Sequence, residues 1–266
     1  VDPALREVIF DFGAAKILHG HAIISPQNGE WIDAEQVKMI LNQAGLENWT
    51  LHESIPDEHT LRESLLSNAK LDEQERGLVI PIDQHFNVKG VGLVAIGYVQ
   101  NGTISKHDEI QVLPAKENGI VRSLQVMDDD VERSIVGDRV GVAIRNLREE
   151  ALHRGCILTH PDADAMTRHD SSTFTLQRAP FQKRDFSEGD VLHAAVDLQF
   201  QVGRVQTIDA GSITVDWEQP LWIQNREAAP VIIAQLDAKN MLSLIHISEP
   251  TRPERIADGL DCLKKK

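Results

Sequence analysis

The stretch Pro81-Ile82-Asp83-Gln84-His85-Phe86-Asn87-Val88-Lys89-Gly90-Val91-Gly92 sets the fold of the central part of the chain. A β-prone run leads into a Gly-x-Gly turn at Gly90 and Gly92. Glycine suits a sharp turn between strands because it tolerates positive φ. No helix pattern follows the turn, so this Gly-x-Gly is not expected to cradle a phosphate. The stretch therefore predicts two strands joined by a tight turn.

Short β-prone runs separated by Gly-containing turns continue beyond this stretch. Short strands at such spacing are typical of a barrel, and we expect one over residues 77–160. A linker at 161–170 then leads to a second series of β-prone runs. This series predicts another barrel, truncated at its end, over residues 171–241.

Residues 1–76 alternate helix and strand signals instead. An amphipathic helix over 4–18 precedes a strand over 21–25, Asp33 can cap a second helix, and a short strand and a third helix follow. Alternation of this kind is typical of a parallel α/β sheet. So few elements cannot cover both faces of a sheet. We therefore expect an incomplete α/β domain that ends in a linker near 71–76.

The composition indicates a soluble globular protein of the cytoplasm. The 266 residues are 41% hydrophobic, carry a net charge of −14 and include two cysteines, Cys156 and Cys262, in no metal-like or redox-like pair. Lone thiols fit a reducing compartment, and no run of about 18 apolar residues suggests a membrane span. An acidic chain is not typical of proteins that coat nucleic acid non-specifically, but it is compatible with one local RNA site. We expect no membrane and no DNA partner.

Neither end of the chain looks like a natural terminus. The chain begins Val1-Asp2-Pro3, with no initiator Met and no signal-peptide pattern. Residues 242–252 match, residue by residue, the translation of a transposase adapter used in sequencing libraries, and the chain ends Lys264-Lys265-Lys266. We therefore expect 242–266 to be an adapter-derived tail with no core to join, so that its removal leaves stability unchanged.

The central residues resemble the second domain of translational GTPases of the elongation factor Tu and selenocysteine-specific elongation factor type, including archaeal paralogues of the latter. In that family an apolar-Pro-acidic strand leads to Phe and then to a Gly-x-Gly turn, as it does here. Three later segments match the family's next hairpin, its Ala-Gly-acidic-x-Val-Gly strand and its closing Arg-Gly segment. Four motifs in the same order are far more specific than any one of them. They occupy residues 81–92, 97–104, 136–145 and 152–158.

The resemblance implies three parts for the chain. Residues 1–76 would be the C-terminal half of a G domain, 77–160 the second domain and 171–241 a truncated third domain. The family binds GTP and Mg²⁺, but no Gly-x-x-x-x-Gly-Lys-Ser/Thr loop occurs in this chain. Where the family has Asn-Lys-x-Asp, whose Asp pairs with guanine, this chain has Ser25-Pro26-Gln27-Asn28. We therefore assign no nucleotide-binding and no catalytic residue, and the resemblance implies a degenerate G domain.

Two basic residues are candidates for contact with RNA. Arg145 aligns with a family arginine near the aminoacyl end of bound tRNA, and a guanidinium suits a phosphate or a terminal base, although a plain surface arginine would fit the same position. Lys89, in the Gly-x-Gly turn, is the second candidate. Residues 181–186 mix aromatic and basic side chains that could stack on RNA, but a loop explains them better. Leu93 and Ile96 stand where the family commonly has Thr, which predicts a more apolar surface that suits a protein partner.

No metal site or catalytic set is legible in the sequence. Asp128-Asp129-Asp130 predicts a solvated turn, because adjacent carboxylates diverge and hard cations need converging oxygens. The histidines, among them His19, His21, His52 and His169, show no partner set for a metal. No Ser/His/Asp or paired-carboxylate arrangement can be traced.

Three functions fit these observations. The first is a cytoplasmic translation elongation factor homologue that binds tRNA or the ribosome. The second is a pseudo-GTPase, an interaction or regulatory module with a protein partner and no nucleotide switching. The third is a divergent active GTPase, so enzymatic activity is undecided. An intact phosphate loop upstream would favour the enzyme, and its loss would favour the interaction module.

We expect this chain to show no measurable GTP binding. A purine edge without its Asp partner loses a charge-assisted hydrogen bond of roughly 1.5–3 kcal/mol, and loss of the phosphate cradle costs more. Isothermal titration calorimetry with GTP and ATP is the measurement. Micromolar GTP binding with a preference over ATP would overturn this prediction.

Overall fold

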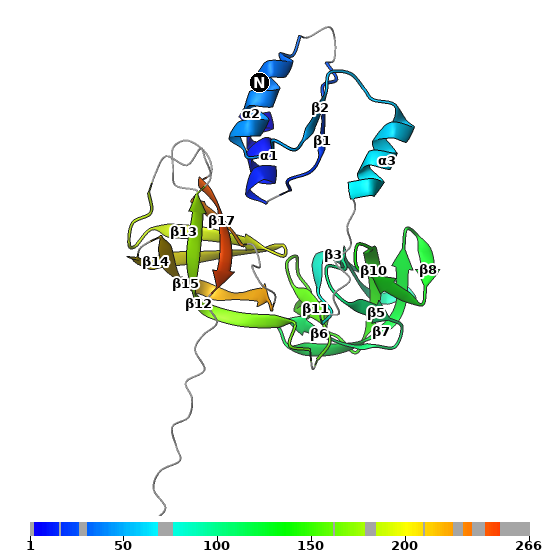
Figure 1. The fold of residues 1–266 in the computed structure, drawn as a ribbon. Helices are drawn as coiled ribbons and strands as arrows, with labels where there is room; N and C mark the ends of the chain where they lie inside the picture. The colour runs from blue at the N-terminus through cyan, green and yellow to red at the C-terminus, as the bar shows by residue number, and fades with distance from the viewer. Residues whose placement is uncertain are drawn as a thin grey trace, which may run out of the picture.

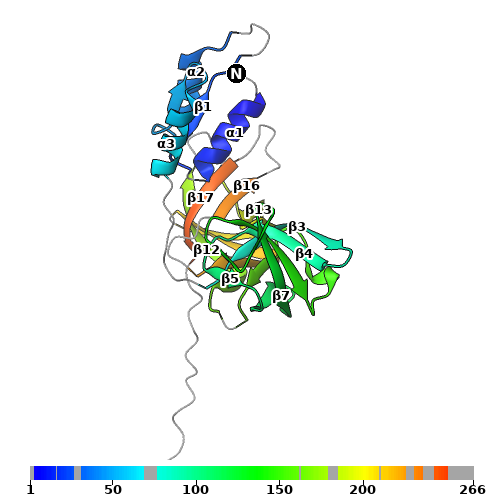
Figure 2. The ribbon, with the colours of Figure 1, turned by 90° about the vertical axis from the view of Figure 1, so that its right-hand side faces the viewer.

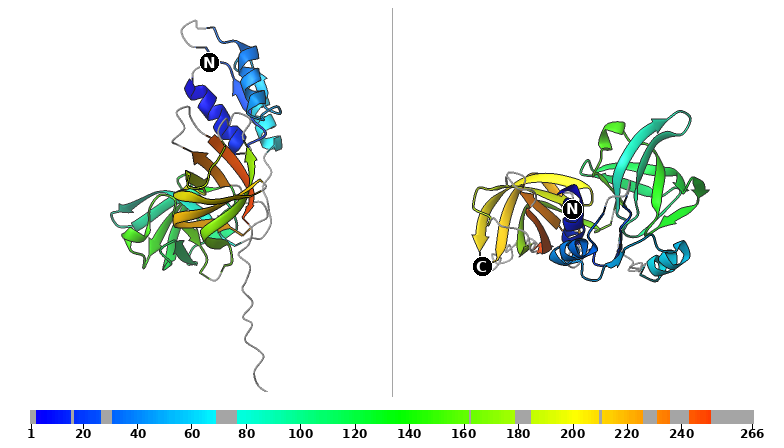
Figure 3. Two further views of the ribbon diagram at one scale, coloured as in Figure 1. Left: turned by 90° about the vertical axis from the view of Figure 1, so that its left-hand side faces the viewer. Right: turned by 90° about the horizontal axis from the view of Figure 1, so that it is seen from above.

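A computed structural model describes residues 3–15, 17–26, 31–68, 77–161, 163–178, 185–209, 211–225, 231–235 and 243–250 (Figure 1). The described chain forms an N-terminal α/β unit above two β-rich bodies that lie side by side (Figures 1 and 3). None of the described helices has the length and apolar character needed to cross a bilayer.

The α/β unit contains the alternating helices and strands that the sequence predicts. Its two strands, β1 and β2, pair in parallel. Asp33 caps helix α2 as expected, since its carboxylate accepts from the backbone N–H of Glu35 at 3.1 Å and of Gln36 at 3.4 Å. The elements are α1 (Pro3–Ala14), β1 (His21–Ile23), α2 (Ala34–Gln43), β2 (Thr50–His52) and α3 (Glu58–Asn68).

The sheet of the α/β unit is too small to cover its helices. Residues of α1 and α2 pack with Ala22, Ile24 and Leu51 on one face of the two strands. On the other face, α3 is linked to β1 by a hydrogen bond of 3.1 Å between the Ser64 hydroxyl and His21 Nε2. Large apolar side chains are left exposed on all three helices and on β1: Leu5, Val8, Ile23, Met39, Leu65 and Leu66.

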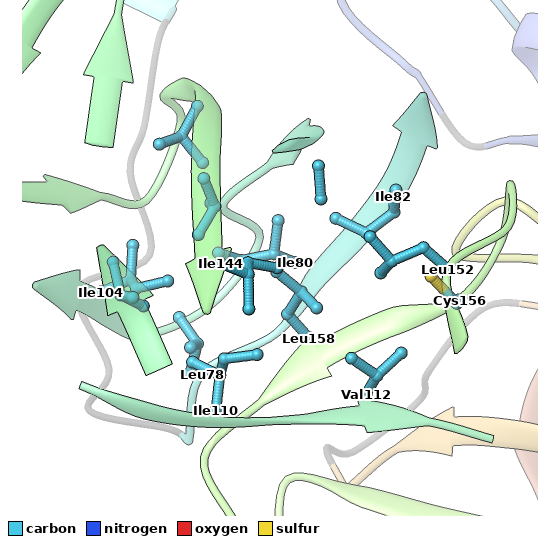
Figure 4. Close-up of a cluster of buried hydrophobic side chains, with 14 of the residues drawn as sticks. Leu78, Ile80, Ile82, Ile104, Ile110, Val112, Ile144, Leu152, Cys156 and Leu158 are labelled. Atoms are coloured by element: carbon cyan, nitrogen blue, oxygen red, sulfur yellow. The ribbon is translucent and has the colours of Figure 1, made fainter. Parts of the chain in front are cut away.

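The first barrel is a ring of antiparallel strands. The sheet order is β10-β4-β3-β11-β6-β7-β8, and an additional pairing of β10 with β7 closes the ring. Its interior is an apolar cluster (Figure 4) that includes Ile80, Ile82, Ile144 and Leu158. The strands of this sheet are β3 (Ile80–Val88), β4 (Gly92–Tyr98), β6 (Glu109–Leu113), β7 (Glu117–Val126), β8 (Asp129–Val131), β10 (Arg139–Arg145) and β11 (Ile157–Thr159). Strands β5 (Thr103–Ser105) and β9 (Arg133–Ile135) pair with each other in a separate two-stranded sheet.

The second barrel is closed by six strands in the order β12-β15-β14-β13-β16-β17. Its core includes Phe174, Trp217 and Leu221. The structure differs from the sequence expectation at the start, because β12 already begins at Met166, inside the stretch expected to be a linker. The strands are β12 (Met166–Arg178), β13 (Val191–Val196), β14 (Gln199–Asp209), β15 (Ser212–Gln224), β16 (Val231–Gln235) and β17 (Ser243–Pro250).

Strand β17 corrects the expectation for the tail. We expected residues 242–266 to lie outside the fold, but the backbone of Ser243–Pro250 pairs antiparallel with β12 on one side and β16 on the other (Figure 2). The expectation of an unpacked segment is therefore wrong for these residues. The physical reason is that ladder hydrogen bonds use backbone groups that every residue except proline carries in full, so a strand position can be filled by a segment of any origin.

The two barrels pack against each other through a polar and an apolar contact. The Gln224 side chain donates to Gln100 Oε1 at 2.6 Å and to the Asp197 carboxylate at 2.9 and 3.0 Å. At Gly155, whose φ is +85°, an added Cβ would lie 2.6 Å from the Leu198 carbonyl oxygen, so this approach requires glycine. An apolar cluster completes the interface: Val79, Leu113, Ile157, Ala165, Met166 and Trp222.

Removal of residues 242–266 should now destabilise the protein. The deletion would leave the edges of β12 and β16 unpaired, and we expect a loss above about 1 kcal/mol in the free energy of unfolding. Denaturant melts of the full chain and of a chain ending at Met241 measure it. Equal stability would show that the second barrel does not depend on β17 and would support the original expectation.

Candidate functional site

Lys89 lies in the turn between β3 and β4. The turn has the backbone geometry that its glycines predict, since Gly90 has φ +86° and Gly92 has φ +100°. One backbone hydrogen bond, from Val91 N–H to the Val88 carbonyl at 3.0 Å, closes it. The Lys89 side chain is exposed. The turn therefore presents an ammonium group at one end of the first barrel.

Arg145 ends strand β10 at the same end of the barrel. Its neighbour Ile144 pairs with Leu93, the second residue of β4, and Arg145 itself pairs with Ile120 of β7. Leu93 is only four residues beyond Lys89, so the register brings the two predicted RNA contacts to one end of the barrel. Among the described residues, neither Lys89 nor Arg145 has an ion-pair partner within 4.0 Å.

Arg122 of β7 joins these two residues and was not singled out from the sequence. Its Nη1 donates to the Gly90 carbonyl at 3.2 Å and also to the Val91 carbonyl. The register of β10 against β7 shifts between Ala143 and Ile144, which leaves Arg122 as the extra residue of the β7 strand. The one signal in the sequence is a basic residue inside an otherwise β-prone run. We name Lys89, Arg122 and Arg145 the basic rim.

An apolar strip on the outer face of the barrel leads to the basic rim. Phe86 pairs with Val94, and Val94 with Ala143, so these side chains share one face. Phe86 is 42% exposed. Ile96 is half-buried on the same face, as the sequence suggested, but Leu93 is 6% exposed and belongs to the core. The expectation that Leu93 contributes to a more apolar surface is therefore wrong.

Two acidic residues lie near the basic rim, and one of them, Glu117, has an ion-pair partner of its own. Arg148 forms an ion pair with Glu117, and the hydrogen bond from Arg148 holds the pKa of the Glu117 carboxyl below its usual value. Glu109 pairs with Ile120, one strand away from Arg145. The rim is thus a local cationic feature in an acidic chain.

The remaining candidates from the sequence do not converge on a site. Asp128 has φ +68° in the turn before β8, and Asp130 accepts from Gln125 at 3.0 Å. His21 Nδ1 lies 2.9 Å from His52 Nε2, which is a hydrogen-bonded pair. No group of three or more metal-ligating side chains is found among the described residues. Residues 181–184 of the aromatic and basic stretch lie outside the described part.

The Cys156 thiol is inside the core of the first barrel (Figure 4). It is 0% exposed, and burial raises its pKa to about 11. A thiolate is the reactive form of cysteine, so this position does not suit nucleophilic chemistry. Burial also lowers the pKa of His169, which is 7% exposed on β12.

Comparisons with known proteins agree with this architecture. The family description "Elongation factor Tu domain 2" matches residues 92–159. An uncharacterized protein of Methanocaldococcus jannaschii is 28% identical over 194 residues, which are 73% of this chain and 61% of that protein. The selenocysteine-specific elongation factor of the same organism is 41% identical over 85 residues, 32% of this chain and 18% of the factor. Elongation factor 1-alpha of Methanopyrus kandleri is 29% identical over 172 residues, 60% of this chain and 40% of the factor.

Two solved structures have the same fold. A bacterial selenocysteine-specific elongation factor superposes with a TM-score of 0.77 at 19% identity, covering 96% of this chain and 44% of the other. The apo form of the elongation factor SelB from Methanococcus maripaludis gives 0.76 at 20% identity, covering 93% and 60%. The chain thus spans less than two thirds of the length of these relatives.

Residues 92–159 are thus matched as an elongation factor Tu domain 2, and a second closed barrel follows them. In sequence and fold the chain is similar to translational GTPases of the elongation factor Tu and selenocysteine-specific elongation factor type. At 19–20% identity the solved structures show the fold alone.

Cys156 should react very slowly with thiol reagents in the native protein. At pH 8 a thiol with a pKa of about 11 is about 0.1% thiolate, whereas one with a pKa near 9 is about 9% thiolate. We expect Cys262→Ser protein to react at least about 100-fold more slowly when folded than in guanidinium chloride. Ellman's reagent measures both rates. Comparable rates in the two conditions would contradict the burial of Cys156.

Proposed function

We propose that this protein is a cytoplasmic translation elongation factor homologue that binds the single-stranded 3′ end of tRNA on the first barrel. The observation that carries the proposal is the meeting of Lys89 and Arg145 at one end of the barrel, beside an apolar strip that contains Phe86. The family relation favours a role in translation.

The chemistry of the basic rim and the apolar strip suits an RNA end. The guanidinium of Arg145 can bind a phosphate through two parallel hydrogen bonds, and the Lys89 ammonium adds a point charge. The exposed part of the Phe86 side chain offers apolar and aromatic surface to an unstacked base. Base contact and phosphate contact would therefore be adjacent, as a terminal nucleotide requires.

The negative charge of the second barrel favours an RNA ligand that contacts only the first barrel. Arg168 is paired with Asp170 at 2.6 Å, and Arg204 donates to the Gly189 carbonyl at 2.8 Å. Over residues 163–235 the sequence carries ten acidic and six basic residues, a net charge of −4. A surface with a net negative charge repels a phosphate backbone.

The α/β unit fits the C-terminal half of a degenerate G domain. Its parallel strands, its helix order and the apolar side chains left exposed around a two-stranded sheet support this assignment. The residues do not fit GTP and Mg²⁺, however. Ser25 and Pro26 follow β1 where guanine recognition would need a carboxylate, and the sequence has no phosphate loop. We therefore derive no step through a nucleotide.

A second candidate function is a protein-interaction module without nucleotide switching. The apolar strip on the outer face of the first barrel favours it, since Phe86 is exposed and Ile96 is half-buried there. Exposed apolar surface can mark a position where another polypeptide packs. This function is compatible with loss of the guanine motif and does not require RNA.

Arg145→Ala should weaken binding of a short single-stranded RNA ending in CCA by about tenfold. Because one phosphate contact is lost, the slope of log affinity against log salt should fall by about 0.7. A fluorescence titration across a salt series, with Lys89→Ala tested in the same way, gives both quantities. Full-length tRNA should bind no more than severalfold more tightly than the short RNA.

Arg139→Ala is the matched control, because Arg139 lies at the opposite end of the same strand, about 20 Å from Arg145. It should leave both affinity and salt slope unchanged. Absence of RNA binding by the wild-type chain at low salt would reject this proposal and favour the interaction module.

A further inference from the structure

We propose that Arg122 is a positioning residue that fixes the β3–β4 turn and thereby holds Lys89 beside Arg145. This inference deepens the proposed RNA function and rests on it for its biological meaning. Its structural part, the clamping of the turn, stands on hydrogen bonds within the first barrel and can be tested without RNA.

The turn needs an external clamp because its own backbone is permissive. Gly90 and Gly92 both have positive φ, and an added Cβ at either would meet nothing within 4 Å. Such glycines populate many conformations at little cost. Outside the ladder pair of Val88 with Gly92, the backbone hydrogen bond that restrains the turn is the one from Val91 to Val88. The two bonds from Arg122 Nη1, to the carbonyls of Gly90 and Val91, are the further restraint.

Arg122 reaches the turn across the end of β10. The strand order places β10 between β7, which carries Arg122, and β4, which begins at the turn. The Arg122 side chain therefore extends from the bulge in the middle of β7, across β10, to the turn. Its guanidinium links β7 to the turn between β3 and β4, and by fixing this turn it fixes the position of Lys89 relative to the end of β10.

The hydrogen bonds of Arg122 favour a positioning role over a role as a phosphate ligand. Nη1 is engaged with two carbonyl oxygens of the turn, whereas the described residues offer Lys89 and Arg145 no ion-pair partner. A positioning residue changes RNA affinity through geometry, and a phosphate ligand changes the number of displaced counterions. The salt dependence of binding distinguishes these two roles.

Limited trypsin digestion of the full chain tests the clamp directly, because Lys89 provides a cleavage point in the turn. Arg122→Ala should increase the rate of cleavage at the Lys89–Gly90 bond by about tenfold, since the released turn opens more often. Arg122→Lys should restore protection, because one ammonium can donate to both carbonyls as Nη1 does. Arg139→Ala is the control and should cleave as wild type. An unchanged rate in Arg122→Ala, measured by mass spectrometry of the products, would overturn the inference.

The RNA titration then tests the consequence for binding. Arg122→Ala should weaken binding of the CCA-ended RNA about tenfold with a salt slope within about 0.3 of wild type, and Arg122→Lys should recover most of the affinity. A slope reduced as much as in Arg145→Ala would make Arg122 a phosphate ligand and overturn its positioning role. If the wild-type chain binds no RNA, the proposed function fails while the digestion result still decides the clamp.

Discussion

Strand β10 pairs with two neighbouring strands, and these two pairings determine both the closure of the first barrel and the position of the basic rim. β10 pairs with β4 on one side and with β7 on the other, and the second pairing closes the ring. The same pairing places Arg145 beside the β3–β4 turn. Its register shift frees Arg122 from the ladder, so that this side chain can reach the turn. Closure of the barrel and assembly of the basic rim therefore depend on one strand.

Local patterns predicted the features that local physics controls. The positive φ of Gly90 and Gly92 and the series of short strands separated by turns follow from turn chemistry and alternation. Leu93 could also have been placed correctly, because it stands three residues from Ile96 on one strand and such residues point to opposite faces. Leu93 was wrongly expected at the surface because the family commonly has Thr at the aligned position.

Features that depend on distant parts of the chain were not predictable in the same way. The role of Arg122 arises from a bulge against a strand about twenty residues later in the chain and from a turn whose Gly90 lies 32 residues earlier. The backbone of Ser243–Pro250 pairs with two strands, β12 and β16, and β12 lies about seventy residues earlier in the chain. The early start of β12 at Met166 follows from pairing with β15, which no local signal reveals. In each case, the structure of a segment is determined by a second segment that is distant in the sequence and adjacent in the fold.

The contact between Gly155 and the Leu198 carbonyl has a mechanical consequence. The backbones of the two barrels are in contact at this point, and the Gln224 amide is hydrogen-bonded to residues of both barrels. These contacts restrict bending at the junction of the barrels. A force applied to the second barrel would therefore move the first barrel together with it. The basic rim would be carried through space with its internal geometry preserved. The second barrel can thus set the orientation of the basic rim, while residues of the first barrel set its chemistry.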